Sequence, residues 1–417
     1  MSSQLLTCRS LNGNKTYNIS SDEFNCAAHF EKCECPPLQS NADVAGIGVV
    51  IAFLVSASLT LLLTITFLLL SASYVDTRNP IDKVVRQKLG APVQEWIGKE
   101  RSQKWSYVLY DMVVCLSDQQ LVTGIALLVA ALKLLNDSTI TVYQFSIAVD
   151  LAWFSANTHF LSLTVVRSFR NSAKPNLLNE TQKPHEKSME RYPLVFRVVL
   201  MSALAAMLVY VSWIEGYIDW YHTFNCPAKC TISSTKGGES LRWAISNITF
   251  IIFDYIFNFI SLSAPIRAYW AHRLRPRLVR DRSASGEPSQ KTDHLTKKIL
   301  LVCWYLYSSE TTDVLLQIIW HIIGHLEFFS DRILGHILMS PEQIKEEDTL
   351  GFGQLVPIVL LALLILQLLE SFAERMEDTA SDRRSSNGGQ PSSPRWYQHL
   401  NDSSSTVELR PLNRTTW

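Results

Sequence analysis

Several acidic and amide side chains of this 417-residue chain lie inside long apolar runs. An ionisable group placed in a bilayer costs about 2.5 to 3.5 kcal/mol, so it normally faces the interior of a helix bundle, where it has a partner or a task. At 100° per residue these side chains gather on three helical faces, each spanning about 60° to 80°. The faces are Ser146, Asp150, Trp153 and Asn157; Asn247, Asp254, Asn258 and Ser261; and Glu310, Asp313, Gln317 and His321. The sequence therefore predicts an intramembrane polar pocket formed by Asp150, Asn157, Asp254, Asn258, Glu310, Asp313 and Gln317.

The four carboxylates define the chemistry of this pocket. Counted at 1.5 Å per residue, Asp150, Asp254, Glu310 and Asp313 each lie about 15 to 22 Å from the nearest predicted start of their run, which is close to the middle of a bilayer. We expect no Lys or Arg at that depth, so the acids must be protonated, hydrogen-bonded or paired with a bound cation. Two interpretations stay open: a pocket for a cation, a proton or an amine-bearing ligand, or a hydrogen-bond network that only holds helices together.

Seven apolar runs must position these residues, because a bilayer core of about 30 Å needs roughly 20 helical residues. The runs are 46–70, 112–135, 140–166, 195–217, 241–265, 298–323 and 352–372. The first carries no charge, and the last is almost as apolar. We expect an all-α membrane protein, a seven-transmembrane-helix bundle over residues 44–372. A Cys-rich extracellular or lumenal segment (1–43) should precede it, and a polar, disordered cytoplasmic tail (373–417) should follow.

Basic residues orient these spans. Most of the 38 Lys and Arg residues lie in the loops after spans 1, 3 and 5 and in the tail, which places the N-terminus outside and the C-terminus in the cytoplasm. An exported N-terminus fits the plasma membrane or an endomembrane, vacuolar or secretory. The loop 267–282 is rich in arginine and could bind anionic lipid or a cytoplasmic partner; the alternative is that it only reflects topology. Zero net charge gives no reason to expect nucleic acid.

Six cysteines lie in segments predicted to be outside: Cys8, Cys26, Cys33, Cys35, Cys226 and Cys230. An exported segment meets an oxidising compartment, so we expect disulfides that tie the N-terminal segment to the loop after span 4. Sequence alone cannot choose the pairing. The alternative is a zinc site made by Cys26, His29, Cys33 and Cys35. The sequons at Asn14 and Asn18 are candidate glycosylation sites.

Catalytic motifs of soluble enzymes are not found: the chain has no GxSxG, HExxH or Walker A pattern. We expect no cofactor. We also expect no intramembrane metal site, because the topology places His159 in the inner half of the bundle and His321 and His325 at its outer edge. One metal ion cannot bridge ligands about 20 Å apart.

Two stretches resemble known sequences. SDQQLVTG (117–124) and LAWFSANTHFLSLTVVRSF (151–169) are similar to stretches shared by a group of uncharacterised integral membrane proteins of filamentous ascomycete fungi. This resemblance implies a fungal seven-span membrane protein and supplies no site residues. The plan also resembles that of heptahelical receptors, in topology only. Span 3 ends in VVRSFR rather than an acidic-Arg-aromatic triplet, and span 7 has no NPxxY.

These features favour a receptor-like or sensor protein of a membrane, with a polar acidic pocket and a possible small cationic or polar ligand. A proton- or cation-coupled transporter is the alternative. A membrane-embedded enzyme acting on a lipid or an apolar metabolite, and a structural scaffold, are further alternatives.

Overall fold

The computed structural model describes residues 5–9, 16–20, 35, 37–71, 80–172, 191–217, 224–232, 238–262, 309–351 and 354–362, with a few single residues up to 373. Internal contacts divide the chain into two units, Met1–Ala362 and Leu363–Trp417. The elements below all belong to the first unit.

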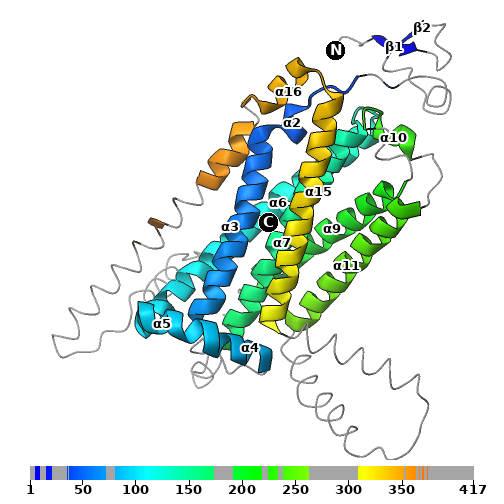
Figure 1. The fold of residues 1–417 in the computed structure, drawn as a ribbon. Helices are drawn as coiled ribbons and strands as arrows, with labels where there is room; N and C mark the ends of the chain where they lie inside the picture. Colours follow the sequence, from blue (N-terminus) through cyan, green and yellow to red (C-terminus); the bar gives the residue numbers. More distant parts are fainter. Residues whose placement is uncertain are drawn as a thin grey trace, which may run out of the picture. The chain divides into compact units, whose positions relative to one another are not determined.

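Six long helices form the described bundle (Figure 1). They are α3 (Ile47–Leu70), α6 (Lys99–Asn136), α7 (Val142–Ser172), α9 (Arg191–Glu215), α11 (Gly238–Leu262) and α15 (Glu310–Leu338). Three stretches, Ala42–Leu70, Lys99–Asn136 and Val195–Glu215, are long and apolar enough to cross a bilayer. They indicate a membrane protein. Of the seventh predicted span, residues 354–362 are helical.

Helix α7 lies at the centre of the bundle. It packs against α3, α6, α9, α11 and α15, and almost every side chain from Val142 to Val165 is buried. A central helix meets protein on all sides, so it can carry polar groups such as Asp150 and Asn157 without exposing them to lipid. The polar face predicted for this run is therefore an interior face.

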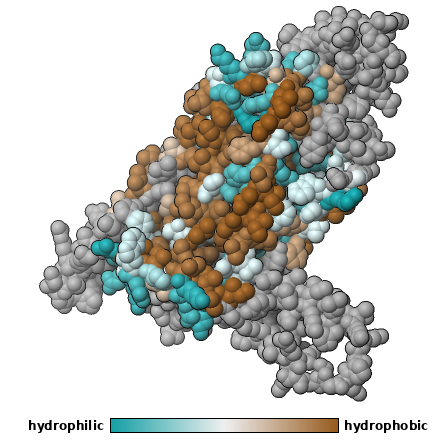
Figure 2. All heavy atoms as spheres, in the orientation of Figure 1, coloured by the Kyte–Doolittle hydropathy of each residue, from teal (hydrophilic) through white to brown (hydrophobic). Residues whose placement is uncertain are grey.

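The outer surface of the bundle is apolar. Large apolar side chains of α3, α9, α11 and α15 are exposed, among them Leu62, Phe196, Ile256 and Leu326. Figure 2 shows hydrophobic residues over the middle of one face and hydrophilic residues toward its ends. Apolar residues outside and polar residues inside are the distribution that a bilayer favours.

One end of the bundle, called the cap end here, carries three short helices: α2 (Ala42–Ala45), α10 (Ala228–Thr231) and α16 (Pro341–Asp348) (Figure 1). Cys35 and Cys226 form a disulfide there. Val142 N–H donates to the Cys226 carbonyl at 2.9 Å, which ties the segment around Cys226 to the start of α7. The cap end therefore joins the N-terminal segment to the loop before α11, as the cysteine positions predicted.

A β-hairpin is the other N-terminal element. Strands β1 (Leu5–Arg9) and β2 (Thr16–Ser20) pair antiparallel, with Leu5 opposite Ser20 and Arg9 opposite Thr16. The described part of the predicted Cys-rich segment thus contains strand as well as helix, within a chain whose described residues are mainly α-helical.

The opposite end of the bundle is formed by α4 (Pro80–Val85), the π-helical turn η3 (Arg86–Gly90) and α5 (Ala91–Ile97). Gly98, with φ +92°, allows the sharp change of direction between α5 and α6. Side chains of α5 and of the start of α6 turn inward: Gln94 and Ser102 both donate to the Leu70 carbonyl at 2.8 Å, and so satisfy the last turn of α3.

Helix α15 differs most from its predicted bounds. The sequence placed a span at 298–323, but the described helix begins at Glu310 and ends at Leu338. Ser309 caps it by accepting from Thr312 N–H at 3.2 Å, and Asp82 of α4 accepts from Thr311 N–H at 2.9 Å. Glu310 and Asp313 therefore lie in the first turn of the described helix, and residues 298–308 of the predicted span lie outside the described residues.

Candidate functional site

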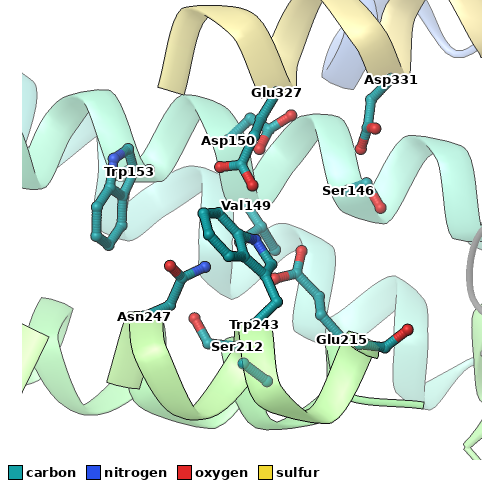
Figure 3. Close-up of a pocket in the computed structure, with 12 residues that line it drawn as sticks. Ser146, Val149, Asp150, Trp153, Ser212, Glu215, Trp243, Asn247, Glu327 and Asp331 are labelled. Atoms are coloured by element: carbon teal, nitrogen blue, oxygen red, sulfur yellow. The ribbon is translucent and has the colours of Figure 1, made fainter. Parts of the chain in front are cut away.

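A pocket lies between α7, α9, α11 and α15, in the half of the bundle nearer the cap end. It is partly open to solvent. Figure 3 shows carboxylates from three helices directed toward this space. We call it the Asp150 pocket; it is lined by Ser146, Val149, Asp150, Trp153, Ser212, Glu215, Ser240, Trp243, Ala244, Asn247, Glu327 and Asp331.

Four carboxyl groups lie close together in this pocket: those of Asp150, Glu215, Glu327 and Asp331. Glu215, Glu327 and Asp331 are all close enough to Asp150 to interact with it electrostatically. Among the described residues none of the four forms an ion pair. Arg332, the residue after Asp331, points elsewhere and donates to the Ala45 carbonyl at 2.8 Å. Like charges gathered without a counter-charge favour the binding of a cation.

Polar atoms in the pocket wall have unused hydrogen-bonding capacity. Within the described part of the chain, Asp150 Oδ2 and Asn247 Oδ1 are buried and have no hydrogen-bond partner. Glu327 accepts a hydrogen bond from the indole of Trp243. A buried acceptor without a partner costs free energy, so an ammonium donor entering this space would relieve that cost.

An aromatic layer separates the pocket from deeper parts of the bundle. It consists of one side chain from each of three helices: Trp153 of α7, Phe250 of α11 and Trp320 of α15. The ring centroids of Phe250 and Trp320 are 4.1 Å apart, and Trp153 lies 5.7 Å from each of them. Trp153 also lines the pocket. An indole face beside carboxylates suits an organic cation, which the ring attracts through its quadrupole.

A second set of polar side chains lies on the other side of this layer, and we call it the Asp254 network. Gln317 Nε2 donates to Asp254 Oδ2 at 3.0 Å, and Asn157 Nδ2 donates to the Gln317 carbonyl at 3.4 Å. Asn258 Nδ2 donates to the Asp254 carbonyl at 3.0 Å. Asp313 lies close enough to Asp254 to interact with it electrostatically. The network thus connects α7, α11 and α15.

Two arginines neutralise acids that the sequence left without a cation, so that expectation is wrong. Arg167 NH2 lies 3.0 Å from Asp313 Oδ2, and Thr164 also donates to this carboxylate. Arg86 pairs with Glu310. Arg167 can reach Asp313 because α7 continues as a helix to Ser172. Arg86 can reach Glu310 because its side chain is buried at the η3 end of the bundle.

The seven predicted pocket residues therefore fall in three places. Asp150 lines the pocket between α7, α9, α11 and α15. Asn157, Asp254, Asn258, Asp313 and Gln317 form the Asp254 network. Glu310 lies at the η3 end of the bundle with Arg86.

Four residues of the Asp150 pocket were missed by the sequence reasoning: Glu215, Trp243, Glu327 and Asp331. Glu215 sits at the last residue of α9. Glu327 and Asp331 lie beyond the predicted end of the sixth span at residue 323, although their spacing of four residues places them on one face of a continuing helix. A sixth span predicted to continue beyond residue 323 would have included both residues.

Several predicted disulfide, glycosylation and basic residues lie partly or wholly outside the described residues. Cys8 and Asn18 lie on described strands, but their side chains, like that of Cys230, are not described. Cys26, His29, Cys33, Asn14 and the 267–282 loop lie outside the described residues. Of the histidines, His159 Nδ1 lies 2.5 Å from Ser117 Oγ, and His321 Nε2 lies 3.2 Å from Ser58 Oγ. In the described part of the chain no group of three or more His, Cys, Asp or Glu side chains is arranged to hold a metal ion.

Comparison with known proteins gives one curated relative to report. The chain is 37% identical over 128 residues to "Elsinochromes biosynthesis cluster protein HP3" of the fungus Elsinoe fawcettii. The match covers 30% of this chain and 46% of the relative, so the chain spans less than half the length of the relative it matches. This similarity supports a fungal protein, as the two sequence stretches indicated. No family model matches the chain, and no solved structure matches it.

Proposed function

We propose that this protein is a receptor-like multi-pass membrane protein that binds a small organic cation in the Asp150 pocket. The observation that carries the proposal is the pocket itself: four carboxylates without an ion pair among the described residues, an orphaned Asp150 oxygen, and the rings of Trp153 and Trp243 in one space. An ammonium group would neutralise the acids, and its apolar body would pack on the rings.

The topology belongs to the same proposal. Seven spans with the cap end outside and the η3 end in the cytoplasm agree with the distribution of Lys and Arg. The Cys35–Cys226 disulfide at the cap end supports an extracellular or lumenal location for that end, because disulfides persist in oxidising compartments. The plasma membrane and an endomembrane are equally compatible with this orientation.

The arrangement of α15 supports a receptor rather than a simple binding protein. This helix carries Glu327 and Asp331 in the pocket and Glu310 at the opposite end, where it pairs with Arg86 of η3. From Asp331 to Glu310 the helix extends about 31 Å at 1.5 Å per residue. A ligand that shifts α15 in the pocket would therefore change contacts at the cytoplasmic end.

Ligand binding is the test. Full-length protein in detergent would be screened by thermal shift against organic ammonium compounds and matched neutral compounds. Hits would be compared between wild type and Asp150→Asn. The matched control is Asp137→Asn, which makes the same change in the exposed turn after α6. Stabilisation by cations that Asp150→Asn removes and Asp137→Asn keeps is the expected result. Equal stabilisation of all three proteins, or no response to any cation, would overturn the proposal.

A cation-coupled transporter is the second candidate, and one observation favours it. The Asp254 network continues the line of polar groups beyond the aromatic layer on three of the four helices that line the pocket. In proteoliposomes, a transporter would take up the stabilising cation when a proton or sodium gradient is applied, and Asp254→Asn would abolish uptake. A protein that binds the cation but moves none of it supports the receptor.

A further inference from the structure

We propose that the Asp254 network is a separate binding site for one small monovalent metal cation of the size of Na⁺. The site is independent of the ligand in the Asp150 pocket. It would be made by side-chain oxygens of four residues: Asn157, Asp254, Asp313 and Gln317. All four are almost completely shielded from solvent, at 3%, 0%, 1% and 1% relative exposure.

Each of these side chains has one buried oxygen that is left over. Within the described residues Asn157 Oδ1, Asp254 Oδ1, Asp313 Oδ1 and Gln317 Oε1 have no hydrogen-bond partner. The amide orientations follow from their donors, because Asn157 Nδ2 donates to the Gln317 carbonyl and Gln317 Nε2 donates to Asp254. Four unsatisfied buried acceptors in one connected network need an explanation, and native interiors rarely leave even one.

The charges of the network indicate which charge a bound ion would carry. Two carboxylates, Asp254 and Asp313, belong to the network, and Arg167 is the described cation that interacts electrostatically with both. One positive charge against two negative charges leaves one uncompensated. A monovalent cation closes that balance, whereas a divalent cation would leave an excess of positive charge in a low-dielectric interior.

The number of unsatisfied acceptors distinguishes a bound metal ion from a bound proton. A proton placed on one carboxylate would satisfy that oxygen and one further acceptor, and would leave the other two without a partner. A hard cation takes several oxygen ligands at once, from carboxylates and amide carbonyls alike. The site therefore fits a sodium-sized ion better than a shared proton.

The aromatic layer keeps this site apart from the Asp150 pocket. Along α7, Trp153 lies between Asp150 and Asn157; along α15, Trp320 lies between Glu327 and Gln317. Phe250 of α11 completes the layer. An organic cation held on the cap side would thus sit on the rings and would not reach Asp254.

The experiment measures cation binding by the whole protein in detergent, without any pocket ligand. Melting temperatures would be recorded at fixed pH and ionic strength in chloride salts of sodium, potassium and choline, and direct binding would be measured with radioactive sodium. The variants are Asp254→Asn, which removes the excess charge, and Asn157→Ala, which removes one neutral oxygen. Asp137→Asn in an exposed turn is the control.

The expected result is sodium-dependent stabilisation and saturable sodium binding in wild type and in the control. Binding should be lost in Asp254→Asn and weakened in Asn157→Ala, so the second variant answers the question if the first does not fold. No sodium binding in wild type would overturn the site, and stabilisation by acid alone would replace the ion with a proton. Unchanged binding in both variants would place any bound sodium elsewhere.

Discussion

The buried ion pair between Arg86 and Glu310 should be strongly coupled. Both side chains are only 8% exposed, and Arg86 NH2 has Ser168 Oγ as a further neighbour at 3.3 Å. Removing one partner of a buried pair leaves an uncompensated charge and typically costs about 3 to 5 kcal/mol, whereas removing both costs far less. Because both side chains keep some exposure, we take the lower end of this range, about 3 kcal/mol.

We therefore expect Glu310→Gln to lower the free energy of unfolding by about 3 kcal/mol, because Arg86 loses its counter-charge. The double variant with Arg86→Met should lose only about 1 kcal/mol, which gives a coupling energy of about 2 kcal/mol or more once Arg86→Met alone is measured. The assay is denaturant unfolding of the four proteins in one detergent, with the same slope in each. Single effects that add to the double effect would mean that the pair does not hold α15 to η3.

Three further predictions follow from other contacts. Replacing Cys35 and Cys226 by Ser should lower the free energy of unfolding by up to about 5 kcal/mol, the loop-entropy limit for cysteines 191 residues apart. In thermal melts, reducing agent should destabilise wild type more than the variant, and an equal effect on both would contradict a stabilising Cys35–Cys226 bond. Burial raises the pKa of the Glu347 carboxyl above 4.5. The folded state therefore binds this proton more tightly than the unfolded state, and stability falls as the pH rises above that value. The melting temperature of Glu347→Gln should change less between pH 4 and 7 than that of wild type, and an identical pH dependence would contradict the raised pKa. A Cβ on Gly335 would lie 2.2 Å from the buried ring of Tyr143, so Gly335→Ala should cost about 1 to 3 kcal/mol by denaturant unfolding, and a stability equal to that of wild type would refute this close packing.

The polar faces of the spans were predictable because hydrophobic periodicity reports which side of a helix is buried. Asn157, Asp254 and Gln317 were assigned to faces of three different runs, and these faces do meet in the bundle. The cysteine positions likewise predicted a disulfide between the N-terminal segment and the loop before α11, although the choice of Cys35 with Cys226 needed the fold.

The position of a residue along its span was harder to predict than the side of the helix on which the residue lies. The sixth span read from composition ends at residue 323, before the charged residues that follow, but α15 continues through Glu327 and Asp331 because they face a pocket rather than lipid. Its start is set by Asp82, a residue more than 200 positions earlier in the chain. No local pattern carries that information, and this long-range cap places Glu310 at the η3 end of the bundle, away from the other predicted pocket acids.

The positions of the arginines show why the net charge of the bundle interior cannot be counted from the predicted spans alone. Arg86 and Arg167 belong to segments that composition assigns to the cytoplasmic side, yet both side chains are buried against acids of α15. Once they are counted, Asp313 and Glu310 are compensated, and the uncompensated charge of the described interior is concentrated on Asp254 and on the Asp150 pocket. A protein that only needed to hold its helices together could have paired these acids in the same way. Glu310 and Asp313 each pair with an arginine, whereas among the described residues Asp254 and the acids of the Asp150 pocket form no ion pair, and that difference is the reason to look for cations at those places.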